Sequence, residues 1–420
     1  MIGAQGLPEG RRAGPSLALF FARVVYAFNW YNVGAVLPLI GSSLGAGTAE
    51  LGIVLGAFLL GVGIFQVPAG FASVRFGARR VSLAGVAVLG VAGVASAFAP
   101  TWPILAVLRF VGGVGAAFFF SPALSLIASY FPPGRRGPVI GFYNGGFSVG
   151  GAAGLFAGAY LGLALGWGWA LGVGGLALLA VTALAAGILP RRPNEGRGGT
   201  LAELWADGSA VLVSRSIWGL SLGLSGFWTA IYALNQYLVQ WVAVVHPGWG
   251  IAFAAMLSGI VVLVSFPGGP VGGWLGERVR RRRRLLVLLG IAVGALVFTV
   301  PYAPLVLLVP ILVVLGFMDG VIFAIIYLIP AYLPETRGEG LALGVAAVNS
   351  IQVILGSGLA IGFGFVAAAV GYTPAWWFAG ALTVGLLPFL ALVRPTPVLG
   401  GRPDGPVAAT SPRAARPPSP

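Results

Sequence analysis

The stretch Gly70-Phe71-Ala72-Ser73-Val74-Arg75-Phe76-Gly77-Ala78-Arg79-Arg80 decides the fold. Long apolar runs precede and follow it, so it is a short basic turn between two helices that can each cross a membrane, which takes about 20 residues. A similar turn returns much later as Gly273-Trp274-Leu275-Gly276-Glu277-Arg278-Val279-Arg280-Arg281-Arg282. The repetition divides the chain into two similar halves.

The composition indicates an all-α membrane protein. Hydrophobic residues make up 58% of the chain and charged residues only 8%, whereas soluble domains carry about 25% charged residues. Membrane β-barrels alternate polar and apolar residues in segments of about ten, and the apolar runs here are longer and continuous. The 68 glycines suit helices that pack closely in lipid.

Turn residues separate the apolar runs into twelve expected membrane-spanning helices. In chain order they are about 17–41, 49–73, 81–99, 103–130, 138–161, 167–189, 212–240, 250–275, 285–303, 305–332, 340–368 and 374–393.

The arginines predict the orientation of these helices. Every even-numbered turn contains arginine, no odd-numbered turn does, and both ends of the chain are basic. By the positive-inside rule, both termini and all even-numbered turns are expected in the cytoplasm, with the chain in the cytoplasmic (inner) membrane. The net charge of +14 is thereby explained by topology, and no nucleic-acid partner is expected.

The expected organisation has five parts. Segment 1–16 is a cytoplasmic N-terminal segment, 17–190 and 212–395 are six-helix bundles, 191–211 is a cytoplasmic linker, and 396–420 is a disordered cytoplasmic tail rich in Pro, Gly and Ala. Residues 103–114 of the fourth span resemble residues 310–321 of the tenth. Because these two spans have the same orientation, the bundles are predicted to be parallel repeats around a central cavity.

The basic turns resemble the signature of the major facilitator superfamily. Its first copy matches at Gly70, Arg75, Gly77, Arg79 and Arg80, although Val74 occupies the position of the usual aspartate. The second copy matches at Gly273, Glu277 and Arg278, whereas Arg280 replaces a glycine. The resemblance implies the fold of that superfamily and a conformational latch formed by these eight matching residues. It also implies that spans 1, 4, 7 and 10 line the cavity.

Three charged residues lie well inside these spans: Arg23, Arg109 and Asp319. A charge at mid-membrane costs at least about 2.5–3.5 kcal/mol on insertion scales, so it usually has a function. Arginine can bind a carboxylate through two parallel hydrogen bonds, and a buried aspartate can carry protons. We therefore expect both arginines to bind substrate and Asp319 to couple transport to protons. The alternatives are arginines bonded to backbone carbonyls and an aspartate paired with one of them.

Uncharged polar residues extend the expected substrate site. Each of them could instead form a hydrogen bond between helices, worth about 0.6 kcal/mol on average. The candidates are Tyr26, Asn29, Asn32, Tyr143, Asn144, Asn235, Gln236, Asn349 and Gln352.

The sequence predicts a secondary active transporter that works by alternating access. With two arginines and one aspartate inside the spans, a small organic anion such as a carboxylate, moved together with protons, is the expected substrate. A proton-coupled exporter of drugs or lipophilic metabolites is the alternative. We expect no enzymatic activity, cofactor or metal site, because the chain has no cysteine or lysine and one histidine. The other expected contacts are membrane lipids, and a monomer is expected.

Overall fold

The computed structural model describes residues 7–131, 136–191, 211–279, 281–333, 336 and 340–394. Within these ranges the chain is helical and contains no strand. Eleven helices are long and apolar enough to cross a membrane, and the number rises to twelve when a bent helix pair near the start is taken as one span. The predicted all-α membrane fold is confirmed.

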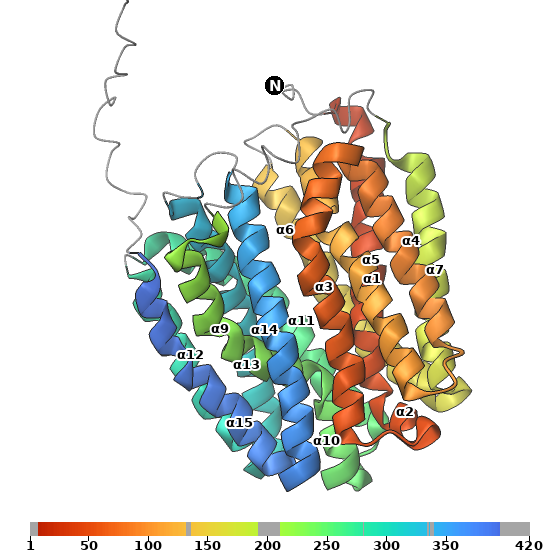
Figure 1. The fold of residues 1–420 in the computed structure, drawn as a ribbon, viewed down its shortest axis with the longest axis vertical. Helices are drawn as coiled ribbons and strands as arrows, with labels where there is room; N and C mark the ends of the chain where they lie inside the picture. Colours follow the sequence, from red (N-terminus) through yellow and green to blue (C-terminus); the bar gives the residue numbers. More distant parts are fainter. Residues whose placement is uncertain are drawn as a thin grey trace, which may run out of the picture.

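Within each half the spans follow one another closely along the chain (Figure 1). The first half contains η1 (Glu9–Arg11), α1 (Ala13–Ala35), α2 (Leu37–Leu44), α3 (Thr48–Phe76), α4 (Ala78–Ser96), α5 (Trp102–Ser129), α6 (Arg136–Leu165) and α7 (Trp167–Ile188). The second contains α9 (Arg215–Gln236), α10 (Leu238–Val245), η3 (Pro247–Trp249), α11 (Ile251–Arg278), α12 (Arg282–Thr299), η4 (Val300–Tyr302), α13 (Leu305–Leu328), η5 (Ile329–Tyr332), α14 (Gly340–Val370), α15 (Tyr372–Gly385) and η7 (Leu387–Leu392).

The first and seventh spans are each broken, which the sequence analysis did not anticipate. At Val36 the chain bends by 56° between α1 and α2. Pro38 explains this break, because proline lacks the N–H of a helix interior and disfavours helical backbone in the preceding residue. The corresponding break at Tyr237 separates α9 from α10, and no proline or glycine lies beside it.

The two halves pack internally in a similar way and then against each other along two helix pairs. In the first half α1 packs on α6, and α5 packs on α3 and α4. In the second half α11 packs on α13 and α9 on α14. The halves meet chiefly where α3 contacts α14 and where α6 contacts α11 (Figure 1).

Glycines bring the backbones of α3 and α14 into contact at the end away from the arginine-bearing turns. A Cβ atom added at Gly56 would lie 2.3 Å from Cγ1 of Ile361, and one added at Gly63 would lie 3.0 Å from the backbone nitrogen of Ile354. Such distances leave no room for a side chain. This end of the bundle is therefore closed by direct helix contact between the halves.

At the arginine-bearing end the same helices have parted. Gly70 lies about two turns beyond Gly63 on the same face of α3, and a Cβ there would meet nothing within 4 Å. Gly141, one turn before Gly145 on α6, also faces open space, whereas Gly145 contacts α11. A groove of about 560 Å³ separates the end of α3 from Leu212 of the second half. The bundle is thus open at its arginine-bearing end.

One pair of arginines shows the internal repeat in atomic detail. Arg79, in the first turn of α4, donates to the carbonyls of Ala186 and Leu189 at the end of the sixth span. Arg283 occupies the same position in α12 and donates to the carbonyls of Ala391 and Val393 at the end of the twelfth span. Each half therefore fastens its third span to its sixth with one arginine.

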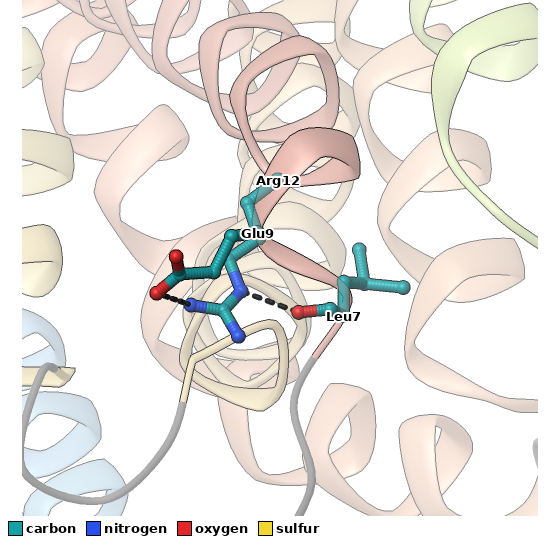
Figure 2. A network of polar contacts seen from close by, with 3 residues as sticks. All are labelled: Leu7, Glu9 and Arg12. Carbon is teal, nitrogen blue, oxygen red and sulfur yellow. Dashed lines mark hydrogen bonds and ion pairs between the residues drawn. The ribbon is translucent and has the colours of Figure 1, made fainter.

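The N-terminal segment lies against the end of α5. Arg12 forms an ion pair with Glu9 at 3.5 Å and donates from Nε to the carbonyl of Leu7, as Figure 2 shows. The backbone nitrogen of Leu7 in turn donates to the carbonyl of Tyr130. Residues 192–210 of the expected linker and all of the expected tail lie outside the described residues. The boundaries of the two bundles stay predictions.

Candidate functional site

Arg23 of α1 lies buried among aromatic rings, with an exposed fraction of 5%. Its guanidinium carbon is 4.6 Å from the ring centre of Phe147 and 4.7 Å from that of Phe120. The rings of Tyr26 and Tyr143 are at 4.8 and 5.4 Å. Attraction by four ring faces offsets part of the cost of burying the charge. Within the described structure no hydrogen-bond acceptor contacts Nε or Nη1, and no carboxylate forms an ion pair with this arginine.

Asp319 of α13 is half-buried on the opposite half. It forms no ion pair with any arginine that the structure describes. The alternative expectation, an aspartate paired with an arginine, is therefore not met in this conformation. Arg23 and Asp319 both act electrostatically on Tyr31 and Tyr327, so both charges lie within range of these two tyrosines, and neither forms an ion pair with a described residue. The arrangement leaves both charges available to a bound molecule or a proton.

Arg109 of α5 has a more structural environment than Arg23. It is buried, stacks on Phe58 with its guanidinium carbon 4.2 Å from the ring centre, and donates from Nη1 to the carbonyl of Asn29 at 3.1 Å. This geometry is the carbonyl-bonded alternative considered from the sequence. Nε and Nη2 nevertheless have no acceptor among the described residues. Direct substrate binding by Arg109 stays a prediction, and its visible contact holds α5 to α1.

Asn29 and Asn32 hold α1 against α7. Asn29 donates to the carbonyls of Val25 and Gly174, both at 2.8 Å, and so uses both amide hydrogens. Asn32 donates to the carbonyl of Ala170 at 3.1 Å. These contacts join helices of the first half, which is the alternative to substrate binding for both residues. Each bond of this kind contributes about 0.6 kcal/mol on average.

A polar chain crosses between the halves where α3 and α14 begin to part. Asn349 donates to Oε1 of Gln66 at 2.7 Å, and its own Oδ1 accepts a hydrogen bond from Tyr327. Gly63 lies about one turn before Gln66 on α3, on the side of the closed end, and its carbonyl accepts a hydrogen bond from Ser350. Asn349 therefore connects Tyr327 of α13 to the interface between the halves.

The polar residues of the seventh span are buried near the closed end. Gln236 donates to the carbonyl of Trp30 at 3.1 Å and thus links α9 to α1. The Oδ1 atom of Asn235 accepts no hydrogen bond from any described residue. Gln352 of α14 accepts a hydrogen bond from the indole of Trp228 at 3.2 Å.

The two candidates on α6 face different surroundings. Tyr143 is fully buried beside Arg23, and its hydroxyl has no partner in the described part of the chain. Asn144 is exposed. Only Tyr143 therefore belongs to the aromatic surroundings of Arg23.

The predicted latch residues occupy the two arginine-bearing turns. Gly77 adopts a φ of +92°, which a residue with a side chain rarely adopts, and it separates α3 from α4. Arg75 and Arg80 are exposed, whereas Arg79 is buried and bonded to the end of α7.

In the second copy, Glu277 is exposed and forms no ion pair with a described residue, while Arg278 stacks on Trp274. Gly273 faces open space. With the halves parted at this end, a latch between the turns is not engaged, and its role stays a prediction.

Several aromatic residues that shape the site were not predicted from the sequence. Phe120 and Phe147 surround Arg23, and Tyr31 lies near Asp319. Tyr232 donates to the carbonyl of Leu55 across the halves. The spacing of Tyr143 and Phe147, one helical turn apart, was a usable signal for a shared face. The other positions follow only from tertiary packing.

A family model described as the Major Facilitator Superfamily matches residues 19–357. The chain belongs to this superfamily. The predicted membership is confirmed, and the protein is a multi-pass membrane transporter rather than an enzyme.

Curated relatives of this MFS chain include two transporters named for organic anions. A gallate transporter of Pseudomonas putida is 28% identical over 83% of this chain and 86% of its own length. A D-galactonate transporter of Escherichia coli is 24% identical over 91% and 96%. A puromycin resistance protein of Streptomyces alboniger is 29% identical over 62% of this chain. The match spans only 48% of that relative, about half its length.

Solved structures share the MFS fold over nearly the whole chain. A crystal structure of a D-xylose–proton symporter superposes with a TM-score of 0.72 at 16% identity and covers 93% of this chain and 99% of its own. A bacterial homologue of the human lysosomal transporter Spinster, inward-facing and unoccupied, gives 0.68 at 20% identity, covering 92% and 96%. At this level of identity the likeness shows the fold alone.

Proposed function

We propose that this MFS protein transports a small organic anion, such as a carboxylate, together with protons by alternating access. In the proposed orientation the arginine-bearing turns and both termini lie in the cytoplasm, and the chain lies in the cytoplasmic membrane. The parted end described above would then open to the cytoplasm. Relatives named for gallate and galactonate transport support an anionic substrate.

The observation that carries the proposal is the buried guanidinium of Arg23, which forms no ion pair with a described residue and has no hydrogen-bond partner at Nε and Nη1. Taking a charge out of water costs several kcal/mol unless it gains a partner. The rings around Arg23 supply only part of that compensation, and no described carboxylate supplies the rest. A substrate carboxylate would supply a charge-assisted hydrogen bond to an N–H group of Arg23 that has no partner.

Asp319 is proposed to carry the coupling proton. It is half-buried, lies within electrostatic range of the same two tyrosines as Arg23 and has no described cation partner. A carboxyl group in this position can bind a proton when the cavity faces one side and release it on the other. Anion and proton would thus occupy opposite walls of the same cavity.

Ligand binding to the purified protein tests the anion site. Melting temperatures are measured with benzoate and gluconate, and with xylose and tetraphenylphosphonium for comparison. We expect at least one anion to raise the melting temperature, because a ligand at about 100 times its Kd contributes about 2.7 kcal/mol. Arg23→Gln should abolish the shift. Arg80→Gln, which alters an exposed arginine in a turn, should retain it.

The unliganded melting temperature separates binding from a structural role. Removing a buried charge without a partner should leave the empty protein as stable as before or more stable. If Arg23→Gln instead lowers the unliganded melting temperature while the anion shift persists, Arg23 is structural and the proposed site is wrong.

Export of lipophilic compounds remains the second candidate. Trp228, Phe323 and Tyr327 form a partly exposed aromatic wall in the second half, and one relative is named for puromycin resistance. A stabilising shift with tetraphenylphosphonium alone, together with resistance of expressing cells to puromycin, would select this function over anion transport.

A further inference from the structure

A second basic site lies away from Arg23, at the arginine-bearing end of the second half. It is a pocket of about 230 Å³. Five arginines line it: Arg281, Arg282, Arg283, Arg284 and Arg394. None of the lining residues in the described part of the chain is acidic.

The pocket combines these arginines with an apolar wall. The wall includes Leu220 of α9, Leu286 of α12 and Ile329 of η5. The arginines reach it from the start of α12 and from the end of η7, where the backbone nitrogen of Arg394 donates to Ser216. All of these elements belong to the second half, so the pocket is separate from the interface between the halves.

Two of the five arginines in this pocket are not needed to hold the helices, whereas Arg282 donates to the carbonyl of Gly276 and stacks on Tyr332. Among the described residues of the first half, Arg79 is the arginine that bonds the third span to the end of the sixth. Arg283 makes the equivalent contacts in the second half. Arg281 and Arg284 have no hydrogen-bond or ion-pair partner among the described residues, so their charges are additional to that structural role.

The local backbone makes this excess of positive charge stronger. The arginines stand at the N-terminus of α12, which begins at Arg282 and has no acidic residue in its first turn. A helix N-terminus carries about half a positive elementary charge and favours anions, whereas cations there are unfavourable. The pocket therefore holds several positive charges next to a helix end that already favours an anion.

We propose that this pocket binds the phosphate group of an anionic membrane lipid. Guanidinium groups bind phosphate through paired N–H bonds, which suits the several arginines that converge here. The apolar wall suits the glycerol and upper acyl chain that a lipid carries and a free phosphate ion lacks. The pocket lies at the end of the spans where, in the proposed orientation, lipid headgroups of the cytoplasmic leaflet are found.

Native mass spectrometry and thermal shift of the purified full chain test the proposal. The probes are phosphatidylglycerol, phosphatidylcholine and inorganic phosphate, each at increasing salt. We expect phosphatidylglycerol to bind and to raise the melting temperature, with phosphatidylcholine and phosphate far weaker. In Arg281→Gln/Arg284→Gln, phosphatidylglycerol binding should weaken roughly 25-fold, about fivefold for each charge removed near the membrane surface.

The matched control is Arg75→Gln/Arg80→Gln, which removes two exposed arginines from the corresponding turn of the first half. It should bind phosphatidylglycerol as the unaltered protein does. If both double variants lost phosphatidylglycerol binding equally, the proposed site would be wrong, and general attraction between basic turns and anionic lipid would explain the binding. If inorganic phosphate raised the melting temperature and phosphatidylglycerol did not, the occupant would not be a lipid. Because Arg281 and Arg284 are exposed, both double variants should melt at the unaltered temperature without ligand, so a lost shift reports binding.

Discussion

The contact between α3 and α14 makes a quantitative prediction about alternating access. A Cβ at Gly63 would lie 2.5 Å from Cγ1 of Ile354, 3.0 Å from its nitrogen and 3.3 Å from its Cα. The side chain of Ile354 could rotate away from the new methyl group. Its backbone atoms could move away only if the whole of α14 shifted. Gly63→Ala should therefore oppose the closed state of this end, where overpacking costs about 1–3 kcal/mol.

That cost predicts how far the equilibrium moves. A change of 1–3 kcal/mol corresponds to a shift of about 5- to 150-fold between the two states. Because the chain has no cysteine, a single Ser357→Cys substitution can report on the closed end. Ser357 is fully buried in α14, so a maleimide should reach the reporter only when the halves part there. Its labelling rate in Gly63→Ala should rise by the same 5- to 150-fold.

Gly70→Ala is the control on the same helix face. A Cβ at this position meets nothing within 4 Å, so labelling of the Ser357→Cys reporter should stay within about twofold of the background rate. The reasoning fails if Gly63→Ala and Gly70→Ala give equal labelling rates, because the parted and contacting segments of α3 would then be indistinguishable.

The remaining predictions concern the arginines and the turns. Arg79→Gln should lower the melting temperature by several degrees, since hydrogen bonds from charged groups contribute about 1.5–3 kcal/mol, whereas Arg80→Gln should not. Arg109→Lys should also lower it, because lysine cannot both stack on the neighbouring ring and donate to the α1 carbonyl; an unchanged melting temperature would exclude this role. Glu277→Gln should slow transport more than Val74→Asp, as an acid remains only in the second turn; equal uptake rates in the two variants would contradict this.

The spans could be predicted because membrane insertion depends on local hydropathy. Runs of apolar residues, and arginines restricted to alternate turns, are visible without tertiary information. The break at Val36 could also have been predicted from the sequence, because Pro38 disfavours a continuous helix there. The break at Tyr237 could not, because no residue beside it disfavours a helix.

The candidate site could be predicted only in part. Arg23 and Asp319 were identifiable because charges are rare inside spans. What surrounds them depends on which helices meet. The sequence also predicted Arg109 as a substrate-binding residue, yet its contacts with Phe58 and with the Asn29 carbonyl arise from tertiary packing. The ring cage of Arg23 likewise combines residues from α1, α5 and α6, which no local pattern brings together.

Uptake into proteoliposomes tests the central claim most directly. A radiolabelled anion selected by thermal shift is supplied with the outside acidic, and its accumulation is compared with that at equal pH. The account predicts accumulation above the external concentration only with the proton gradient, and none in Arg23→Gln. Asp319→Asn should lose gradient-driven accumulation but retain exchange of internal for external anion. Accumulation that ignores the gradient, or that survives in Arg23→Gln, would contradict the account.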